Sequence, residues 1–261
     1  MTFEWNPADY GRSSSAQERW AAEFIAAIPF AGTEHVLDVG CGDGKVTAML
    51  AGNVPGGRVL GVDSSRPMVE AAMERYAAFA PRLSFQMADA SALPFREEFD
   101  VVFSNSTLHW IRDHRPVLRG IRDALKPGGR AFLRFGGKGS TAEVKKVLHD
   151  LMERPEWNGH FAGFESPFGF YDPIEYIPWI EAAGLEPEHV ELVPRTMRHD
   201  AAGLRGWVRT TKMPYTARIP ESLRETFIGQ VIAEFVRRYP ADESGQFGVN
   251  MPRLDVVASR K

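Results

Sequence analysis

Short apolar runs alternate with amphipathic segments along the first half of the chain. Runs rich in β-branched and aromatic residues predict five strands, at 35–40, 57–63, 83–90, 99–106 and 130–137. Apolar residues at helical spacing predict helices at 13–28, 45–52, 67–80 and 115–126, the last one stopped by Pro127, Gly128 and Gly129. Regular alternation of strands and helices favours an α/β fold with an open, doubly wound, mostly parallel sheet.

The pattern changes after about residue 136. Two late strands, at 184–193 and 251–261, are expected to complete the same sheet and bring it to seven strands. Helical segments at 200–213 and 221–240 and an aromatic-rich stretch at 157–180 predict a lid. The glycine-rich spacing of its aromatics from Trp157 to Tyr171 suits a loop, and these side chains could wall an apolar chamber. We therefore expect a core at 1–136 and, at 137–261, substrate lid insertions plus the two late strands.

Composition narrows the class of protein. The 261 residues are 44% hydrophobic, which is sufficient for a substantial core, and they include a single cysteine, Cys41, so that no internal disulfide is expected. A net charge of −3 gives no overall signature of a nucleic-acid partner or of a membrane surface. With no signal peptide or long apolar run in sight, we expect a cytoplasmic protein, monomeric or homodimeric, that acts on a small molecule.

The first predicted strand runs into a glycine-rich turn, VLDVGCGDGK, at 36–45. Gly40, Gly42 and Gly44 allow a tight turn at the carboxyl end of that strand, where doubly wound sheets bind ligands. A dinucleotide fingerprint starting at Gly40 fails because its sixth position is Lys45, and a phosphate-binding P-loop ending at the same lysine fails at two positions. The turn therefore predicts a ligand site, but it matches neither motif that would indicate a phosphate group in the ligand.

Acidic residues lie in or just after the first three predicted strands. Asp38 is within the first, Asp63 ends the second and Asp89 ends the third, where Ala88 and Ala90 leave room for a flat base. Together these carboxylates suit a cation better than a pyrophosphate. Asp63 could accept hydrogen bonds from ribose hydroxyls, and Asp38 either contacts the ligand or orients the loop.

The ordered set VLDVGCGDG, GVDSS, MADA, FDVVFSNSTLHW and LKPGG resembles the class I S-adenosylmethionine-dependent methyltransferases over residues 10–136. The entry segment YGRSSSAQERWA and the segment NSTLHWIRDH are most similar to the branch of trans-aconitate methyltransferase and other small-acid carboxyl methyltransferases. The resemblance implies a Rossmann-like methyltransferase fold with S-adenosylmethionine as cofactor and S-adenosylhomocysteine as product. The implied cofactor-binding residues are Tyr10, Gln17, Asp38, Gly40, Cys41, Gly42, Asp63, Ser64, Met68, Ala88, Asp89, Ala90, Ser104 and Asn105.

The acceptor is less constrained by the sequence. A carboxylate acceptor is ionised near neutral pH and needs no general base, whereas a phenol, hydroxyl or amine acceptor would make His109 the best-placed base. Trp110 would either pack against the lid or contact the substrate. Arg205 and Arg209 share a helical face with Lys212 and predict either a solvated surface or a clamp for an anionic substrate. No metal site is expected, because no acid or cysteine completes a ligand set with His109 and His114.

Three functions are therefore compatible with the sequence. The first is O-methylation of a small carboxylate such as trans-aconitate, and the second is O- or N-methylation of a natural-product or cofactor precursor. The third is a protein that binds S-adenosylmethionine without turnover. A nicotinamide oxidoreductase is a more distant alternative, since its loop fingerprint is broken at Lys45.

Overall fold

The computed structural model describes residues 15–261, with side-chain surroundings given from Trp20 onward. The described chain divides into two compact units. The first, here called the sheet unit, comprises the described residues up to Gly136 together with Phe168–Val193 and Leu254–Lys261. The second, here called the helical unit, comprises Gly137–Pro167 and Pro194–Arg253.

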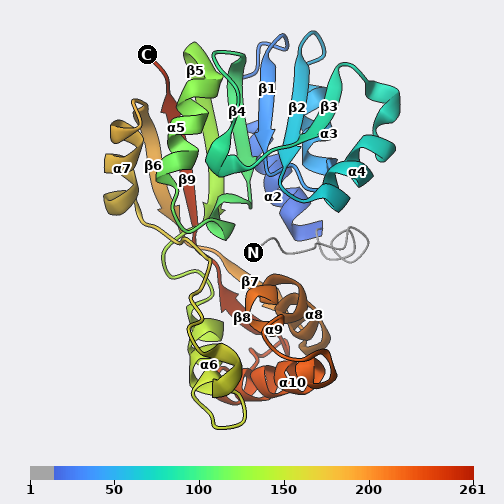
Figure 1. Cartoon of the computed structure of the whole chain (residues 1–261), viewed down its shortest axis with the longest axis vertical. Coiled ribbons are helices and arrows are strands. Elements are labelled where there is room, and N and C mark those ends of the chain that lie inside the picture. The colour runs from blue at the N-terminus through green and yellow to red at the C-terminus, as the bar shows by residue number, and fades with distance from the viewer. Residues whose placement is uncertain (1–14) are drawn as a thin grey trace. The chain divides into compact units, whose positions relative to one another are not determined.

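The sheet unit is built on seven strands in the order β3-β2-β1-β4-β5-β9-β6 (Figure 1). Strands β1 to β5 pair in parallel with their neighbours. The prediction of a doubly wound, mostly parallel, seven-stranded α/β sheet is confirmed. The strands are β1 (His35–Val39), β2 (Arg58–Asp63), β3 (Leu83–Met87), β4 (Phe99–Asn105), β5 (Leu125–Gly136), β6 (Glu186–Val193) and β9 (Arg253–Ser259).

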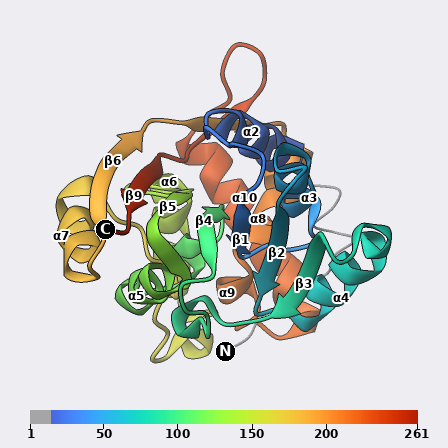
Figure 2. The same cartoon turned by 90° about the horizontal axis from the view of Figure 1, so that it is seen from above.

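Helices cover both faces of this sheet (Figure 2). One face packs under α2, α3 and α4, through buried residues such as Phe24 and Leu50 against Phe103. The other packs under α5 and α7, where Leu118 and Tyr176 are fully buried. These two apolar layers explain why β1 and β4 are almost continuous apolar runs. The helices are α2 (Ser15–Ala26), α3 (Lys45–Asn53), α4 (Arg66–Arg75), α5 (Arg115–Ala124) and α7 (Pro173–Ala182), with 3-10 turns η1 (Ala77–Phe79), η2 (Ala90–Ala92) and η3 (Leu108–Trp110).

Several predicted boundaries differ from the structure. Helix α4 ends at Arg75, five residues before the predicted end at residue 80. Helix α5 ends at Ala124, two residues before the predicted end, and Leu125 of β5 already pairs with Phe99 of β4. The residue before a proline avoids the helical conformation, so Pro127 acts upstream of its own position.

Of the aromatics expected in a loop, from Trp157 to Tyr171, only the stretch Asn158–Phe161 forms a 3-10 turn. Helix α7 begins after them, at Pro173, with a capping box between Asp172 and Glu175.

The strand order reverses at β1, which lies between β2 and β4. Asp38 pairs with Gly61 on one side and Phe103 on the other, so the carboxyl ends of β1, β2 and β4 lie together. In doubly wound sheets the ligand binds in the crevice at this switch point. The glycine-rich turn after β1 therefore stands at the expected binding edge.

The helical unit has its own apolar core. Helix α10 packs against α6 and α8, with Phe227 and Val231 fully buried from α10 and Val144 from α6. Strands β7 and β8 pair antiparallel beside these helices. Its elements are α6 (Ala142–Met152), η4 (Asn158–Phe161), β7 (Thr196–His199), α8 (Ala201–Thr211), α9 (Met213–Thr216), α10 (Glu221–Arg238) and β8 (Phe247–Asn250).

The predicted aromatic segment is divided between the two units. Trp157 and Phe161 are buried in the helical unit, where both rings pack against Phe227. Phe168 and Phe170 belong to the sheet unit. Among the helices of the described chain, none combines the length and the apolar character that crossing a membrane requires.

Candidate functional site

The turn after β1 depends on three glycines with left-handed backbone conformations. The φ angles of Gly40, Gly42 and Gly44 are 81°, 54° and 81°. A Cβ at Gly40 would lie 2.0 Å from Cγ2 of Thr107, and one at Gly44 would lie 2.8 Å from the Phe85 ring, so close packing requires glycine at both. A Cβ at Gly42 would meet nothing within 4 Å. Gly42 therefore borders open space at the carboxyl end of β1.

Asp63 holds this turn in place from the end of β2. Its Oδ2 accepts a hydrogen bond from the Gly42 N–H at 3.0 Å, and its Oδ1 accepts one from the Ser65 N–H at 2.8 Å. Burial raises the pKa of the Asp63 carboxyl, while these backbone hydrogen bonds favour the ionised form. Each carboxylate oxygen has capacity for a second hydrogen bond, so Asp63 can still accept from a pair of ligand hydroxyls.

Asp38 and Cys41 are largely enclosed by protein. Asp38 is 2% exposed and accepts a hydrogen bond from the Thr47 hydroxyl at 2.8 Å, which fastens α3 to β1. Burial, together with the neighbouring charge of Asp63, raises the pKa of Asp38 to about 7 against the opposing effect of the Thr47 hydrogen bond. Cys41 is 6% exposed, and burial raises the pKa of its thiol well above the usual value. A protonated, enclosed thiol argues against Cys41 as a nucleophile.

Strand β4 contributes a buried acceptor beside the turn. Ser104 is fully buried and donates to the Val39 carbonyl at 2.8 Å, while Thr107 donates to the Gly40 carbonyl at 3.0 Å. The side-chain oxygen of Asn105 is buried and has no hydrogen-bond partner within the described chain. Buried acceptors in folded proteins are usually satisfied, so Asn105 marks a position where a ligand donor fits.

The end of β3 lies next to the end of β2. The Ala88 N–H donates to the Asp63 carbonyl at 3.1 Å, and Asp89, which is exposed, caps η2 by accepting from the Ser91 N–H. Ala90 is partly buried against the sheet core. Ala88, Asp89 and Ala90 thus give the end of β3 two small side chains and one exposed carboxylate.

Four other predicted cofactor residues differ in their placement. Ser64 is exposed and Met68 is buried at the start of α4. Tyr10 lies outside the described residues, and Gln17 lies in α2 with its side chain outside the described part.

The open space at Gly42, the unpartnered oxygen of Asn105 and the carboxylates of Asp63 and Asp89 fit an adenosyl cofactor. A cation with an ammonium group and a ribose offers the donors that these acceptors need. Contacts between the named residues and the cofactor stay predictions.

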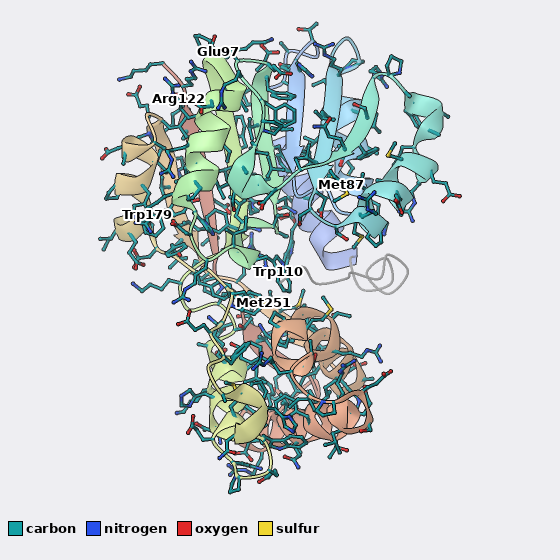
Figure 3. The ribbon with its side chains drawn as sticks, viewed as in Figure 1. Met87, Glu97, Trp110, Arg122, Trp179 and Met251 are labelled. Atoms are coloured by element: carbon teal, nitrogen blue, oxygen red, sulfur yellow. The ribbon has the colours of Figure 1, made fainter. Side chains whose placement is uncertain are left out.

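His109 and Trp110 follow β4 in the turn η3. Figure 3 shows Trp110 and Met87 at the carboxyl ends of the strands, with Glu97 at the opposite end. The Nδ1 of His109 accepts a hydrogen bond from the Gly136 N–H at 3.3 Å, and its ring stacks on Phe170 with 5.9 Å between centroids. A neutral imidazole that accepts at Nδ1 carries its proton at Nε2, so His109 is arranged to donate there.

The three residues of the predicted anion clamp, Arg205, Arg209 and Lys212, lie in different environments. Arg205 is exposed and forms an ion pair with Glu225 at 2.7 Å, and Arg209 is also exposed. Lys212, which shares their predicted helical face, follows the end of α8 and is 3% exposed. Only Lys212 of the three is enclosed.

His114 has a structural environment. It is fully buried, and its two ring nitrogens contact the Tyr176 hydroxyl at 3.1 Å and the Ile111 carbonyl at 3.0 Å. Burial lowers its pKa to about 4, so the imidazole is neutral near pH 7. Within residues 15–261, no group of three or more acidic, histidine or cysteine side chains is arranged to hold a metal ion.

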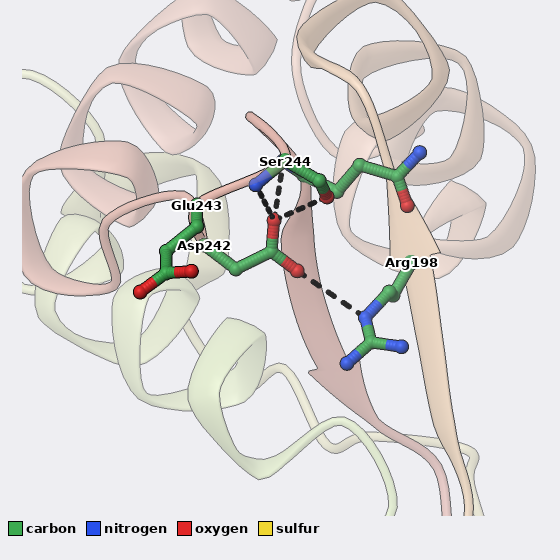
Figure 4. A pocket seen from close by; sticks show the side chains of 5 residues that line it. Arg198, Asp242, Glu243 and Ser244 are labelled. Atoms are coloured by element: carbon green, nitrogen blue, oxygen red, sulfur yellow. Dashed lines mark hydrogen bonds and ion pairs between the residues drawn. The ribbon is translucent and has the colours of Figure 1, made fainter.

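A surface pocket in the helical unit is lined by Arg198, Asp242, Glu243, Ser244 and Gln246 (Figure 4). Asp242 forms an ion pair with Arg198 at 3.3 Å and accepts hydrogen bonds from Ser244 and Gln246. These contacts satisfy its carboxylate within the loop. The pocket is best explained as loop structure.

Thr47 and Thr107 position the site but were not among the predicted residues. Thr47 lies on the first turn of α3, and Thr107 fills the space against Gly40. Their partners come from other elements of the chain, so the local sequence carries no signal for either contact.

The chain is similar in sequence and in fold to known methyltransferases. A family model described as "Methyltransferase domain" matches residues 36–129. Trans-aconitate 2-methyltransferase of Methylobacterium radiotolerans is 30% identical over 269 residues, covering 98% of each chain. The enzyme of the same name from Variovorax paradoxus is 27% identical, covering 99% of each chain. Among solved structures, YcgJ of Bacillus subtilis shares the fold, with a TM-score of 0.62, 18% identity, and coverage of 93% of this chain and 98% of that one.

Proposed function

Because the chain belongs to the trans-aconitate 2-methyltransferase family of S-adenosylmethionine-dependent methyltransferases, we propose that it methylates a carboxylate of a small polycarboxylic acid, with trans-aconitate as the first candidate. The similarity along the whole chain carries this proposal. A match confined to residues 36–129 would indicate only the cofactor domain, whose acceptors differ widely among methyltransferases. Similarity over 98% of the chain includes the helical unit, all of which lies outside residues 36–129.

S-adenosylmethionine supplies a methyl group activated by its positive sulfonium. In the proposed site, the backbone around Gly42 faces the methionine part of the cofactor, Asp63 holds the ribose, and Asp89 borders the base. The side-chain oxygen of Asn105 accepts a hydrogen bond from the methionyl part of the cofactor. These groups align the reactants and exclude water, and alignment is the main requirement when an anion meets a cation.

The arrangement of His109 supports an acid as the acceptor. A carboxylate is ionised at neutral pH and needs no proton removed before it attacks. The Nδ1 of His109 already accepts from Gly136, so the remaining ring nitrogen is a donor. Such a donor suits an anionic acceptor better than it suits a phenol or an amine, which would require a base.

The proposal includes a location and a type of partner. The acceptor is a small molecule, since the net charge of −3 provides no general attraction for a nucleic acid. A cytoplasmic location and a monomeric or homodimeric state complete the proposal.

The test is a methyl-transfer assay on purified protein with trans-aconitate and related di- and tricarboxylates, followed by mass spectrometry. We expect a methyl ester that mild alkali hydrolyses to methanol and the parent acid. The variant Asp63→Ala, which lacks the carboxylate that holds Gly42, serves as the control with impaired cofactor binding.

The alternatives give different results in the same assay. An alkali-stable product would indicate an ether or an amine acceptor. Tight binding of S-adenosylhomocysteine with no product from any carboxylic acid would contradict the proposed reaction.

A further inference from the structure

The helical unit encloses two lysines near one end of α6. Lys212, between α8 and α9, is 3% exposed, and Lys145, in the first turn of α6, is half-buried. Lysine is rarely buried in folded proteins, because removing an ammonium group from water is costly. Two enclosed lysines in one small unit therefore need a physical explanation.

Thr141 connects the two lysines. The Lys212 ammonium donates to the Thr141 hydroxyl at 3.0 Å, and the backbone N–H of Lys145 donates to the Thr141 carbonyl at 2.9 Å. Positions 141 and 145 are one helical turn apart and so lie on the same side of α6. Both lysines are thereby tied to the N-terminal end of this helix.

The electrostatic environment opposes positive charge at this position. Burial, together with the charge of Lys145, lowers the pKa of Lys212 to about 7. Burial lowers the pKa of Lys145 to about 8. The amino end of α6 adds a partial positive charge. An anion beside these groups would stabilise the ammonium forms and offset these effects.

Trp207 supplies an independent observation. Its ring lies 5.0 Å from the Lys212 ammonium, and its side chain is 6% exposed. The indole N–H is buried and has no hydrogen-bond partner within the described chain. An unsatisfied donor beside the Lys212 ammonium indicates a hydrogen-bond acceptor with negative charge.

The acid on the same turn of α6 is Glu143. It lies two residues from Thr141, about 200° around the helix, and its Oε1 accepts a hydrogen bond from Asn250 on β8, while its Oε2 is buried with no hydrogen-bond partner within the described chain. Burial and the charge of Lys145 are the causes of the low pKa of Lys212, and Glu143 is not among them.

We propose that Lys145, Lys212 and Trp207 form a binding site for a carboxylate group within the helical unit. Ammonium groups and an indole N–H are all donors, which matches a carboxylate, an acceptor-only group. The assignment to a carboxylate rests on the proposed function, since that function defines the ligand as an organic acid. The site would take over the role predicted for Arg205 and Arg209, which the structure leaves exposed.

The experiment measures equilibrium binding of trans-aconitate and of propane-1,2,3-tricarboxylate to the whole protein saturated with S-adenosylhomocysteine. The variants are Lys212→Met and Lys145→Met, with Lys146→Met as the matched control, since Lys146 is the next residue of α6 and is exposed. We expect the acid dissociation constant to rise at least tenfold in each of the first two variants and to be unchanged in the control. Trp207→Phe, which removes only the N–H donor and keeps most of the ring, should raise it several-fold.

Two further measurements separate function from folding. The affinity for S-adenosylhomocysteine should be unchanged, and the melting temperature should be equal or higher, because replacing a buried charge with an apolar side chain removes a desolvation cost. The proposal is overturned if wild-type protein binds neither acid, or if both lysine variants bind the acids as wild type does. It is also overturned if weaker acid binding is matched by a lower melting temperature and an equal loss of cofactor affinity.

The outcome is distinct from that of the proposed function. Wild-type protein that binds the acids through these lysines but forms no ester would contradict the reaction and retain the site. If wild-type protein forms the ester and both lysine variants bind the acids with unchanged affinity, the result would support the reaction and contradict the site.

Discussion

The backbone N–H of Gly136 donates a hydrogen bond to Nδ1 of His109, with 3.3 Å between the two nitrogens. This contact joins the end of β5 to the turn after β4 and fixes the proton of the neutral ring on Nε2. His109 is thereby placed as a hydrogen-bond donor, and its possible role as a base can be tested directly.

His109→Gln should reduce the single-turnover rate of methyl transfer to a carboxylic acid by less than about tenfold, because the amide retains a donor and removal of a general base typically costs about 10²- to 10⁴-fold. The rate is measured by rapid quench with saturating cofactor. A reduction of a hundredfold or more would instead assign His109 as the base.

Gly42→Ala should weaken cofactor binding much more than it weakens the fold. The φ of 54° costs alanine about 1 to 2 kcal/mol, and the new Cβ would enter the space assigned to the cofactor. We expect affinity for S-adenosylhomocysteine, measured by calorimetry, to fall at least tenfold.

Gly128→Ala is the matched control for Gly42→Ala. Gly128 has a φ of 79°, and a Cβ there would also meet nothing within 4 Å, but it lies at the start of β5, away from the turn after β1. A similar loss of cofactor affinity in both variants would show that backbone strain alone explains the effect.

Asp38 should make the stability of the protein depend on pH. Its pKa is raised from 3.8 to about 7 in the folded protein, so between these values the folded state binds more protons than the unfolded state. The contribution of Asp38 to the free energy of unfolding therefore falls as pH rises from about 4 to about 7.

Asp38→Asn, whose side chain cannot ionise, should lack that fall while keeping an acceptor for Thr47. Urea unfolding at a series of pH values compares the two proteins. Identical pH profiles would show that Asp38 is ionised in the folded state to the same extent as in the unfolded chain.

Arg134 and Asp255 should be essential to the late strands of the sheet. Their two hydrogen bonds, at 2.9 and 2.7 Å, join β5 to β9, and Arg134 also covers the Phe24 ring at 4.0 Å. Arg134→Met leaves the Asp255 carboxylate buried without this partner, which typically costs about 3 to 5 kcal/mol. Chemical denaturation measures the loss, and Arg134→Met combined with Asp255→Leu should recover part of it.

The affinity for polycarboxylic acids should fall as the pH rises above about 7. An anion binds the ammonium form of Lys212, whose pKa without ligand is about 7, so the binding-competent fraction declines at higher pH. The carboxylates of the acid are already ionised in that range and do not contribute. Calorimetry from pH 6 to pH 9 should show this decline in wild type, and Lys212→Met should reduce its slope.

Much of the sheet unit follows from local sequence. The strand ends at Val39, Asp63 and Asn105 agree with the predicted strands to within a few residues, because apolar runs and glycine turns act over short distances. The beginning of α7 is also encoded locally, by the capping box of Asp172 and Glu175.

The sequence by itself determined the sheet, the glycine turn and the acids beside it, since each depends on residues close together in the chain. Only the tertiary structure decided which charged groups are enclosed. Arg205 and Lys212 share a predicted helical face, yet Arg205 is paired with Glu225 at the surface while Lys212 is buried against Thr141. Burial and ion pairing depend on side chains 20 to 71 positions away, and no local pattern contains them.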